Sequence, residues 1–147
     1  MKSLSTIIVA IAAIFVSTNL VSGQDRIIPS GKLPDAAQSF IKEYFPENAV
    51  SYVKKEAELK KTTYEVTLQD GTEIEFNGKG EWDKVDCKRT GVPAPLVPAT
   101  IAEYVQANFL GQIIVKIDKE RNGYEIELGN DLDLKFDKNG NLREIDD

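Results

Sequence analysis

Two stretches of the chain align with each other, and this internal repeat limits the folds that the chain can adopt. Leu33-Pro34 aligns with Val97-Pro98 at an offset of 64 residues. From Tyr64 onward the offset is 60, so Tyr64-Glu65-Val66 aligns with Tyr124-Glu125-Ile126. The first copy therefore carries four extra residues around 59–63, and these are expected in a hairpin loop, where such an insertion is tolerated. The repeat predicts two copies of one supersecondary unit.

Each copy is predicted to open with a helix. Pro34 or Pro98 stands at the first turn, where the missing N–H of proline costs nothing. Apolar residues follow at helical spacing, at 37, 40, 41, 44 and 45 in the first copy and at 101, 104, 105 and 109 in the second. Pro46 is expected to end the first helix and Gly111 the second.

After each helix the apolar residues alternate with polar ones, as in 64–69 and 124–128. This pattern is typical of antiparallel strands with one face on the core and one in water. Asp70-Gly71, Asn122-Gly123 and Asn139-Gly140 are hairpin turn dipeptides. Four strands are expected in each copy, at about 50–59, 64–69, 73–76 and 82–88 in the first and 113–118, 124–128, 132–136 and 142–146 in the second.

These elements predict an α+β fold with a tandem repeat of one helix plus a four-stranded antiparallel sheet. The first unit would span residues 24–90 and the second 91–147. One unit alone would bury a thin core, so the two are expected to share a continuous sheet of up to eight strands, with the helices packed on one face. The segment 89–95 contains proline and glycine and is predicted to be a short linker.

Residues 1–23 have the features of a secretory signal peptide. Lys2 precedes an apolar run over 7–16, and Val21-Ser22-Gly23 is a small-residue cleavage pattern before Gln24. A retained membrane anchor is the alternative, but the run is shorter than the roughly 20 residues that a spanning helix needs. We expect an exported protein, periplasmic or secreted, that is not held in the membrane after cleavage.

The composition excludes several function classes. The chain has 24 acidic and 18 basic side chains, one of them Lys2, so the exported part carries a net charge of −7 and repels nucleic acid. It has no histidine, which excludes histidine-dependent catalytic triads and the usual zinc sites. Cys87 is the single cysteine and cannot form an internal disulfide. A half-buried strand residue is the expected role, and a free thiol or an intermolecular link is the alternative.

The outward positions of the predicted strands form a broad, mainly acidic face. One interpretation is a docking surface for a cationic or mixed-charge partner, with charge guiding the encounter. The other is a solvated sheet face without a binding role. The candidate partner-binding residues are Tyr52, Lys54, Glu56, Glu65, Thr67, Glu73, Glu75, Lys116, Glu125, Glu127, Asp133 and Lys135.

No catalytic, cofactor or metal site is predicted, and we expect a protein that is not an enzyme. Paired carboxylates can hydrolyse glycosides, but these acids follow strand spacing without cleft-forming loops. The segment 137–141 resembles a calcium loop only weakly, because its sixth position is Leu142 and strands flank it, so a tight hairpin is favoured. Trp82 aligns with Leu142, which favours packing over the alternative of a partner-contacting anchor.

The two copies share a pattern of the form Tyr-Glu-Val-x-Leu followed by Glu-x-x-Phe-x-x-x-Gly, at 64–80 and, with small changes, at 124–140. With the Leu-Pro that opens the first helix, this pattern resembles the PepSY-like family of exported, β-lactamase-inhibitor-like bacterial proteins. The resemblance covers about 33–147 and implies helices packed behind one long, concave antiparallel sheet. In related inhibitors this face grips an enzyme.

The resemblance leads to a functional hypothesis. We expect an exported, cofactor-free binding protein that engages a protein or peptide of the cell envelope through its concave sheet face, as an inhibitor or regulator of an envelope or secreted hydrolase. Related inhibitors are stapled by disulfides, and no segment here matches their enzyme-inserting loop, so no inhibitory residue is carried over. The alternative is a periplasmic module that binds a small molecule or a cation.

Overall fold

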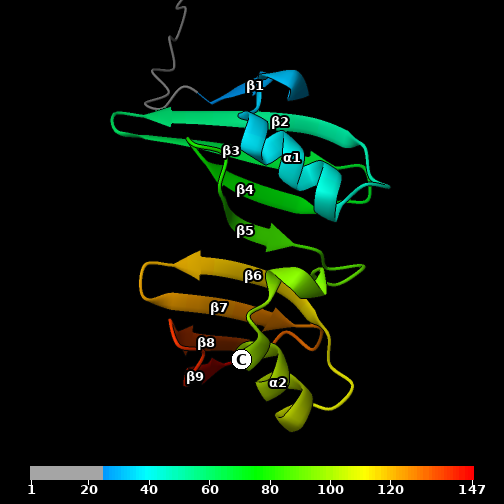
Figure 1. Cartoon of the computed structure of the whole chain (residues 1–147), viewed down its shortest axis with the longest axis vertical. Helices are drawn as coiled ribbons and strands as arrows, with labels where there is room; N and C mark the ends of the chain where they lie inside the picture. The colour runs from blue at the N-terminus through cyan, green and yellow to red at the C-terminus, as the bar shows by residue number, and fades with distance from the viewer. Residues whose placement is uncertain (1–24) are drawn as a thin grey trace, which may run out of the picture.

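The computed structural model describes residues 25–147, so the predicted signal peptide and its cleavage site lie outside the described residues. In residues 25–147, nine strands form one antiparallel sheet in the order of the chain. Figure 1 shows β1 at one edge and β9 at the other, with both helices on the same side of the sheet. The strands are β1 (Arg26–Ile28), β2 (Val50–Glu58), β3 (Lys61–Leu68), β4 (Glu73–Asn77), β5 (Trp82–Asp86), β6 (Ile114–Glu120), β7 (Gly123–Leu128), β8 (Asp133–Asp137) and β9 (Leu142–Asp146).

The helices are α1 (Asp35–Tyr44) and α2 (Ala99–Asn108), each preceded by one 3-10 turn, η1 (Ser30–Lys32) or η2 (Ala94–Leu96). Pro34 and Pro98 are their N-caps, with extended backbone that cannot continue a helix backwards. Each helix is amphipathic and turns two residues fully toward the sheet, Ala37 and Ile41 in α1 and Ile101 and Val105 in α2. The predicted antiparallel α+β fold is confirmed in these elements.

A single row of apolar side chains crosses the sheet from β2 to β9. Residues directly opposite each other on paired strands point to the same face, so the row defines one side of the whole sheet. All of its members except Ile145 are completely buried. The row consists of Val53, Val66, Ile74, Val85, Ile117, Ile126, Leu134 and Ile145.

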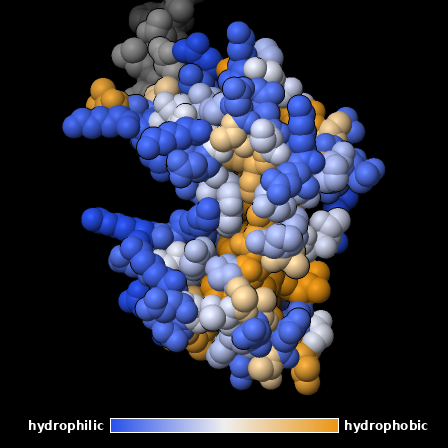
Figure 2. Space-filling model, in the orientation of Figure 1, coloured by the Kyte–Doolittle hydropathy of each residue, from blue (hydrophilic) through white to orange (hydrophobic). Residues whose placement is uncertain are grey.

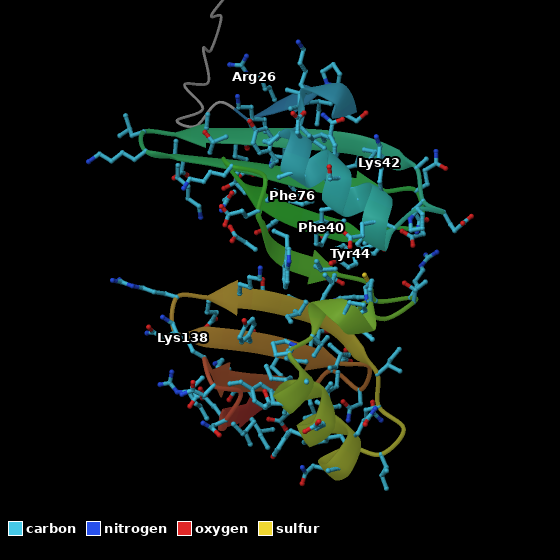
Figure 3. The ribbon with its side chains drawn as sticks, in the orientation of Figure 1. Arg26, Phe40, Lys42, Tyr44, Phe76 and Lys138 are labelled. Carbon is cyan, nitrogen blue, oxygen red and sulfur yellow. The ribbon has the colours of Figure 1, made fainter. Side chains whose placement is uncertain are left out.

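Both helices pack on this row's side of the sheet. The ring of Phe40 on α1 meets Phe76 edge-on, with centroids 5.4 Å apart, and Tyr104 on α2 meets Phe136 in the same way at 5.6 Å. Figure 3 shows Phe40 and Phe76 between α1 and the sheet. Edge-to-face contacts of this kind add about 0.5–1.5 kcal/mol to the burial of the rings.

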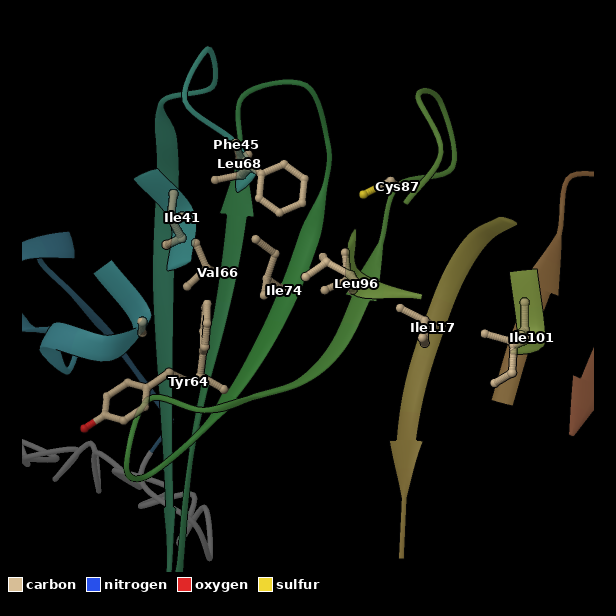
Figure 4. Packing of buried hydrophobic residues seen from close by; sticks show 14 of the residues in the cluster. Ile41, Phe45, Tyr64, Val66, Leu68, Ile74, Cys87, Leu96, Ile101 and Ile117 are labelled. Atoms are coloured by element: carbon tan, nitrogen blue, oxygen red, sulfur yellow. The ribbon is translucent and has the colours of Figure 1, made fainter. Parts of the chain in front are cut away.

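The two halves of the chain share one core. Strand β5 pairs with β6, which places Val85 opposite Ile117. Leu96 on η2 covers this joint and belongs to the same buried cluster, as Figure 4 shows. The segment between β5 and α2 is therefore packed against the sheet and does not act as a loose tether.

The structure corrects two expectations about the strands. The described residues form nine strands and not at most eight, because Arg26–Ile28 adds β1 to the edge of β2. A segment of three residues is too short to show an alternating pattern, so no strand was predicted there. The four extra residues near 59–63 do not form a longer loop. They lengthen a hairpin, since β2 and β3 have 9 and 8 residues while β6 and β7 have 7 and 6.

Candidate functional site

All twelve candidate residues lie on the side of the sheet opposite the helices. The strand registers arrange eleven of them in two rows that cross the sheet, and Glu56 lies two residues beyond Lys54 on the same side of β2. The first row runs through Lys54, Glu65, Glu75, Lys84, Asp118, Glu125, Lys135 and Glu144. The second row runs through Tyr52, Thr67, Glu73, Asp86, Lys116, Glu127, Asp133 and Asp146.

The rows contain five residues that sequence reasoning missed: Lys84, Asp86, Asp118, Glu144 and Asp146. Four of them lie on β5 and β9, which are short strands with charges on both sides of the sheet. The alternation around Val85 and Ile145 was the signal that could have identified them. Together with the twelve candidates they form a surface of seventeen residues, which we call the acidic face.

The acidic face carries the whole excess of negative charge. It holds 4 lysines and 11 carboxylates among its seventeen residues. From residue 24 onward the chain has 17 basic and 24 acidic side chains, so 13 of each remain elsewhere. The helix side, shown in Figure 2, combines hydrophilic surface with apolar atoms near the junction of the two halves. The charge asymmetry is therefore a property of one face and not of the protein surface in general.

The lysines of the acidic face are already paired within it. Lys54 Nζ lies 2.6 Å from Glu56 and 3.4 Å from Asp25, and these contacts raise the pKa of Lys54 to about 12. Lys135 bridges two carboxylates of β9, at 2.9 Å from Asp146 and 3.3 Å from Glu144. The remaining pairs are Lys84 with Glu75 at 3.9 Å, Lys116 with Asp118 at 3.3 Å, and Lys88, from outside the face, with Glu127 at 3.7 Å.

Carboxylates also oppose carboxylates across neighbouring strands. Like charges directly opposite each other destabilise a sheet. Partial burial adds to this penalty at two positions, because it raises the pKa of Glu75 and of Glu125 above the ordinary value of 4.5. The opposed pairs on the described strands are Glu65–Glu75, Glu73–Asp86, Asp118–Glu125, Glu127–Asp133 and Asp133–Asp146.

Two hollows of moderate size border the junction of the halves. The first has a volume of about 350 Å³ and is lined by Glu73 and Asp86 of the acidic face together with Asp70, Lys88 and Arg89. The second is a mainly apolar groove of about 320 Å³ on the helix side, lined by residues of α2, β6 and the preceding turns, among them Val92, Val105 and Ile113. Both are shallow and open, so neither encloses a ligand.

The weak calcium-loop pattern is a hairpin turn in the structure. The Asp137 carboxylate accepts backbone N–H groups of Asn139 and Asn141, each at 2.9 Å, and these hydrogen bonds lower the pKa of Asp137. Asn77 caps the corresponding turn of the first half in the same way, with the N–H groups of Lys79 and Glu81. Within residues 25–147, no three or more His, Cys, Asp or Glu side chains converge as metal ligands would.

Trp82 and Cys87 are both part of the packed structure. Trp82 is half-buried against Phe40, with ring centroids 6.1 Å apart, and Lys119 Nζ lies 3.7 Å from the centre of its ring. Cys87 is buried as a free thiol, and burial raises its pKa to about 11. Neither residue faces the acidic side. In the described part of the chain, no helix is both long and apolar enough to cross a membrane.

Comparisons with known proteins agree with this architecture. The model of the family described as "putative beta-lactamase-inhibitor-like, PepSY-like" matches residues 62–144, more than half of the chain. No curated protein matches the chain. A solved structure from Bacteroides vulgatus, described as a putative periplasmic protein of unknown function, is 41% identical, with a TM-score of 0.81 over 84% of this chain and 100% of that one.

A second solved structure carries a more specific description. This protein of Bacteroides thetaiotaomicron is described as a "putative calcium-regulated periplasmic protein". It is 39% identical, with a TM-score of 0.80 over 84% of this chain and 97% of that one. A third, again a putative periplasmic protein from Bacteroides vulgatus, is 37% identical with a TM-score of 0.80 over 84% of this chain and 98% of that one.

Proposed function

Since the chain belongs to the PepSY-like family of putative beta-lactamase-inhibitor-like proteins, we propose that it is an exported binding protein without catalytic activity. Its acidic face captures a cationic segment of another protein or peptide in the cell envelope, and the capture restrains an envelope hydrolase. The periplasmic descriptions of its solved relatives support the compartment. The inhibitor-like description of the family supports the mode of action.

The opposed carboxylates of the acidic face carry this proposal. A sheet face that only needs to be soluble gains nothing from placing Glu65 opposite Glu75 or Glu127 opposite Asp133. Each such pair destabilises the free protein by about 0.2–1 kcal/mol. A bound cationic segment would turn this repulsion into attraction, and it would find the negative potential concentrated on one side.

We further propose that the two halves are tandem copies of one unit and that each supplies half of the binding surface. Glu65 and Glu125 stand at corresponding positions of β3 and β7, and both oppose the next strand of their own half. The copies differ at the following strand, where Glu75 in the first half corresponds to Lys135 in the second. The first half is thus the more acidic at this position, so the charge of the acidic face differs between its two halves.

An affinity capture with charge-reversed variants tests the proposal. The chain from residue 24 is immobilised and exposed to envelope extract of its own source at low and high salt. The test variant reverses four carboxylates of the acidic face, Glu65, Glu75, Glu125 and Glu127, to lysine. The control variant reverses four exposed carboxylates elsewhere, Glu43, Glu47, Glu81 and Glu103, so that both variants have the same net charge.

The proposal predicts a discrete protein that the unmodified chain and the control variant retain at low salt and that the test variant loses. This protein's hydrolase activity should then fall when the unmodified chain is added. Equal retention by both variants would contradict the assignment of the acidic face. A captured partner whose activity does not change would contradict the inhibitory role while leaving the binding role intact.

A calcium response is a second candidate function, favoured by the description of the Bacteroides thetaiotaomicron relative as calcium-regulated. Opposed carboxylates such as Glu73 and Asp86 are oxygen ligands of the kind that Ca²⁺ takes. A thermal-shift titration with CaCl₂, compared with MgCl₂ and with NaCl at equal ionic strength, tests it. Stabilisation by Ca²⁺ below 1 mM that exceeds both controls supports this function, and equal shifts in all three salts exclude it.

A further inference from the structure

We propose that the open edge of β9 is a second binding site, which takes up an extended segment of another protein as an additional antiparallel strand. The segment carries an apolar residue between two basic ones at alternating positions. Glu144 and Asp146 of β9 also belong to the acidic face, but the site is the unpaired backbone edge of β9, so it does not depend on the binding role proposed for that face.

Strand β9 occupies the same place in its half as β5 does in the first half. Ile145 lies opposite Leu134 on β8, and Val85 lies opposite Ile74 on β4. Both pairings contain a register shift at the same point, before Phe76 on β4 and before Phe136 on β8. The two strands therefore present equivalent outer edges, and Val85 and Ile145 occupy corresponding positions on the helix side of the sheet.

Strand β6 covers the edge of β5, whereas no strand among residues 25–147 pairs with the outer edge of β9. Strand β6 pairs with β5 and buries Val85 completely, with Ile117 directly opposite. On β9, Ile145 continues the buried row but remains 48% exposed, because no described strand follows it. An open strand edge with an exposed apolar side chain is the usual docking point for an added peptide strand. The joint between β5 and β6 supplies the register that such a strand would adopt.

The charges of β9 define the chemistry of the added strand. At the β5–β6 joint, Lys84 opposes Asp118 and Asp86 opposes Lys116, so each side chain meets the opposite sign. The corresponding residues of β9 are Glu144 and Asp146, and both share the single ammonium of Lys135. A strand in the β6 register would need a basic residue opposite each carboxylate and an apolar residue opposite Ile145.

A second copy of the chain does not fit these requirements. Its β9, paired antiparallel with Ile145 opposite Ile145, would place Glu144 opposite Asp146, two like charges. Its β1 would place Ile27 opposite one of these carboxylates, because Arg26 and Ile28 lie on the helix side. Its β6 would place Asp118 opposite Glu144, again two like charges, and its β2 would place Tyr52 opposite Asp146. Both strands are also already paired along the edge in question, β6 with β5 and β2 with β1. The occupant is therefore a segment of a different protein.

A designed peptide tests the site. The probe is the seven-residue β6 sequence, 114–120, with Asp118→Lys, which supplies the basic–apolar–basic pattern. The control peptide carries Ile117→Pro in addition, which keeps the charges but removes an N–H and the strand geometry. Amide hydrogen exchange of the chain from residue 24 is followed by NMR as each peptide is added.

The probe should slow exchange of the β9 amides about tenfold at ten times its Kd, and the control peptide should not. The protein variant Ile145→Asp, at a half-exposed position, should weaken the probe at least about tenfold, because binding would bury a carboxylate. Equal effects of the two peptides, or probe-induced changes confined to the acidic-face residues of β2 to β7, would overturn the proposal. So would self-association of the free chain with protection of β9, which would assign the edge to a second copy.

Discussion

Glu65 and Glu75 lie directly opposite each other on β3 and β4, on the side of the sheet opposite α1 and α2. Glu75 is partly buried there, and this burial raises its pKa even though Lys84 lies 3.9 Å away. The folded state therefore holds a carboxylate that would be more stable in the unfolded chain. Residues that lower the stability of the folded state in this way are most often found at functional sites.

Replacing Glu75 with glutamine should stabilise the isolated protein. The pKa of Glu75 in the folded protein lies above the ordinary value of 4.5. At pH values above this folded-state pKa, the ionised carboxylate therefore destabilises the folded state relative to the unfolded state. The penalty disappears at low pH, where Glu75 is protonated in both the folded and the unfolded state. We expect Glu75→Gln to raise the free energy of unfolding at pH 7 by a few tenths of a kcal/mol, since partial exposure screens the interaction.

Urea denaturation at pH 7 and at pH 3 measures the effect. The gain should be present at pH 7 and absent at pH 3. Glu103→Gln, at an exposed position on α2, serves as the control and should change stability at neither pH. A loss of stability in Glu75→Gln at pH 7 would show that the ion pair with Lys84 outweighs the repulsion from Glu65.

Salt should stabilise the free protein. The acidic face has five opposed carboxylate pairs on the described strands, and their mutual repulsion is screened as ionic strength rises. We expect the melting temperature to increase between 10 mM and 500 mM NaCl at pH 7. A variant with Glu65, Glu73, Glu125 and Asp133 changed to the corresponding amides should melt higher at low salt and respond less to NaCl. An identical salt response in both proteins would contradict this account.

The sequence predicted the helices, the antiparallel strands and the side of the sheet on which the candidate residues lie. This was possible because the period of the apolar residues changes from helical spacing to two at each helix end. It did not predict β1, whose three residues show no period. It also missed Lys84 and Glu144, because a register irregularity at 83 and 143 leaves only three alternating residues on each strand, and both strands carry charges on each side.

Strand pairing is the information that a single sequence lacks. The alternation assigns Glu65 and Glu75 to one face, but only the register between β3 and β4 shows that they are opposite each other. The same holds for the exposure of Ile145, which has the sequence environment of a core residue and lies at an open edge. Both proposed binding sites depend on such relationships.

Gly80, in the turn between β4 and β5, packs against the start of α1. Its replacement should therefore reduce the free energy of unfolding. Its φ is +84°, and a Cβ there would lie 2.8 Å from Pro34 Cβ and 2.9 Å from the Ala37 nitrogen. Gly80→Ala therefore combines backbone strain with a clash against the start of the helix, and we expect a loss of more than about 2 kcal/mol in unfolding free energy. Gly71→Ala, with φ of +89° but open space around the Cβ, should lose only about 1 kcal/mol. Equal losses in urea denaturation would contradict the clash.

Cys87 should be unreactive in the folded protein. Its thiol is 1% exposed, and burial raises its pKa to about 11. The thiolate is the reactive form, so at pH 8 the folded protein should react with iodoacetamide at least about 100-fold more slowly than the unfolded protein in urea. Mass spectrometry of the alkylated chain measures both rates. Comparable rates in the two states would contradict the buried position and reopen the possibility of an intermolecular disulfide.

Ile117 at the β5–β6 joint tests whether the two halves unfold as one. Ile117→Ala removes a completely buried side chain and should reduce the unfolding free energy by about 2–5 kcal/mol. The matched control is Ile145→Ala, in the same row of the sheet but 48% exposed, which should lose less than about 1.5 kcal/mol because much of its surface remains in water.

If the shared core makes folding cooperative, Trp82 fluorescence, which reports on the first half, and circular dichroism of the whole chain should give coincident urea transitions in the parent chain and in both variants. Separate transitions in the parent chain would show that the halves are independent. Separation in Ile117→Ala alone would show that this single contact couples them.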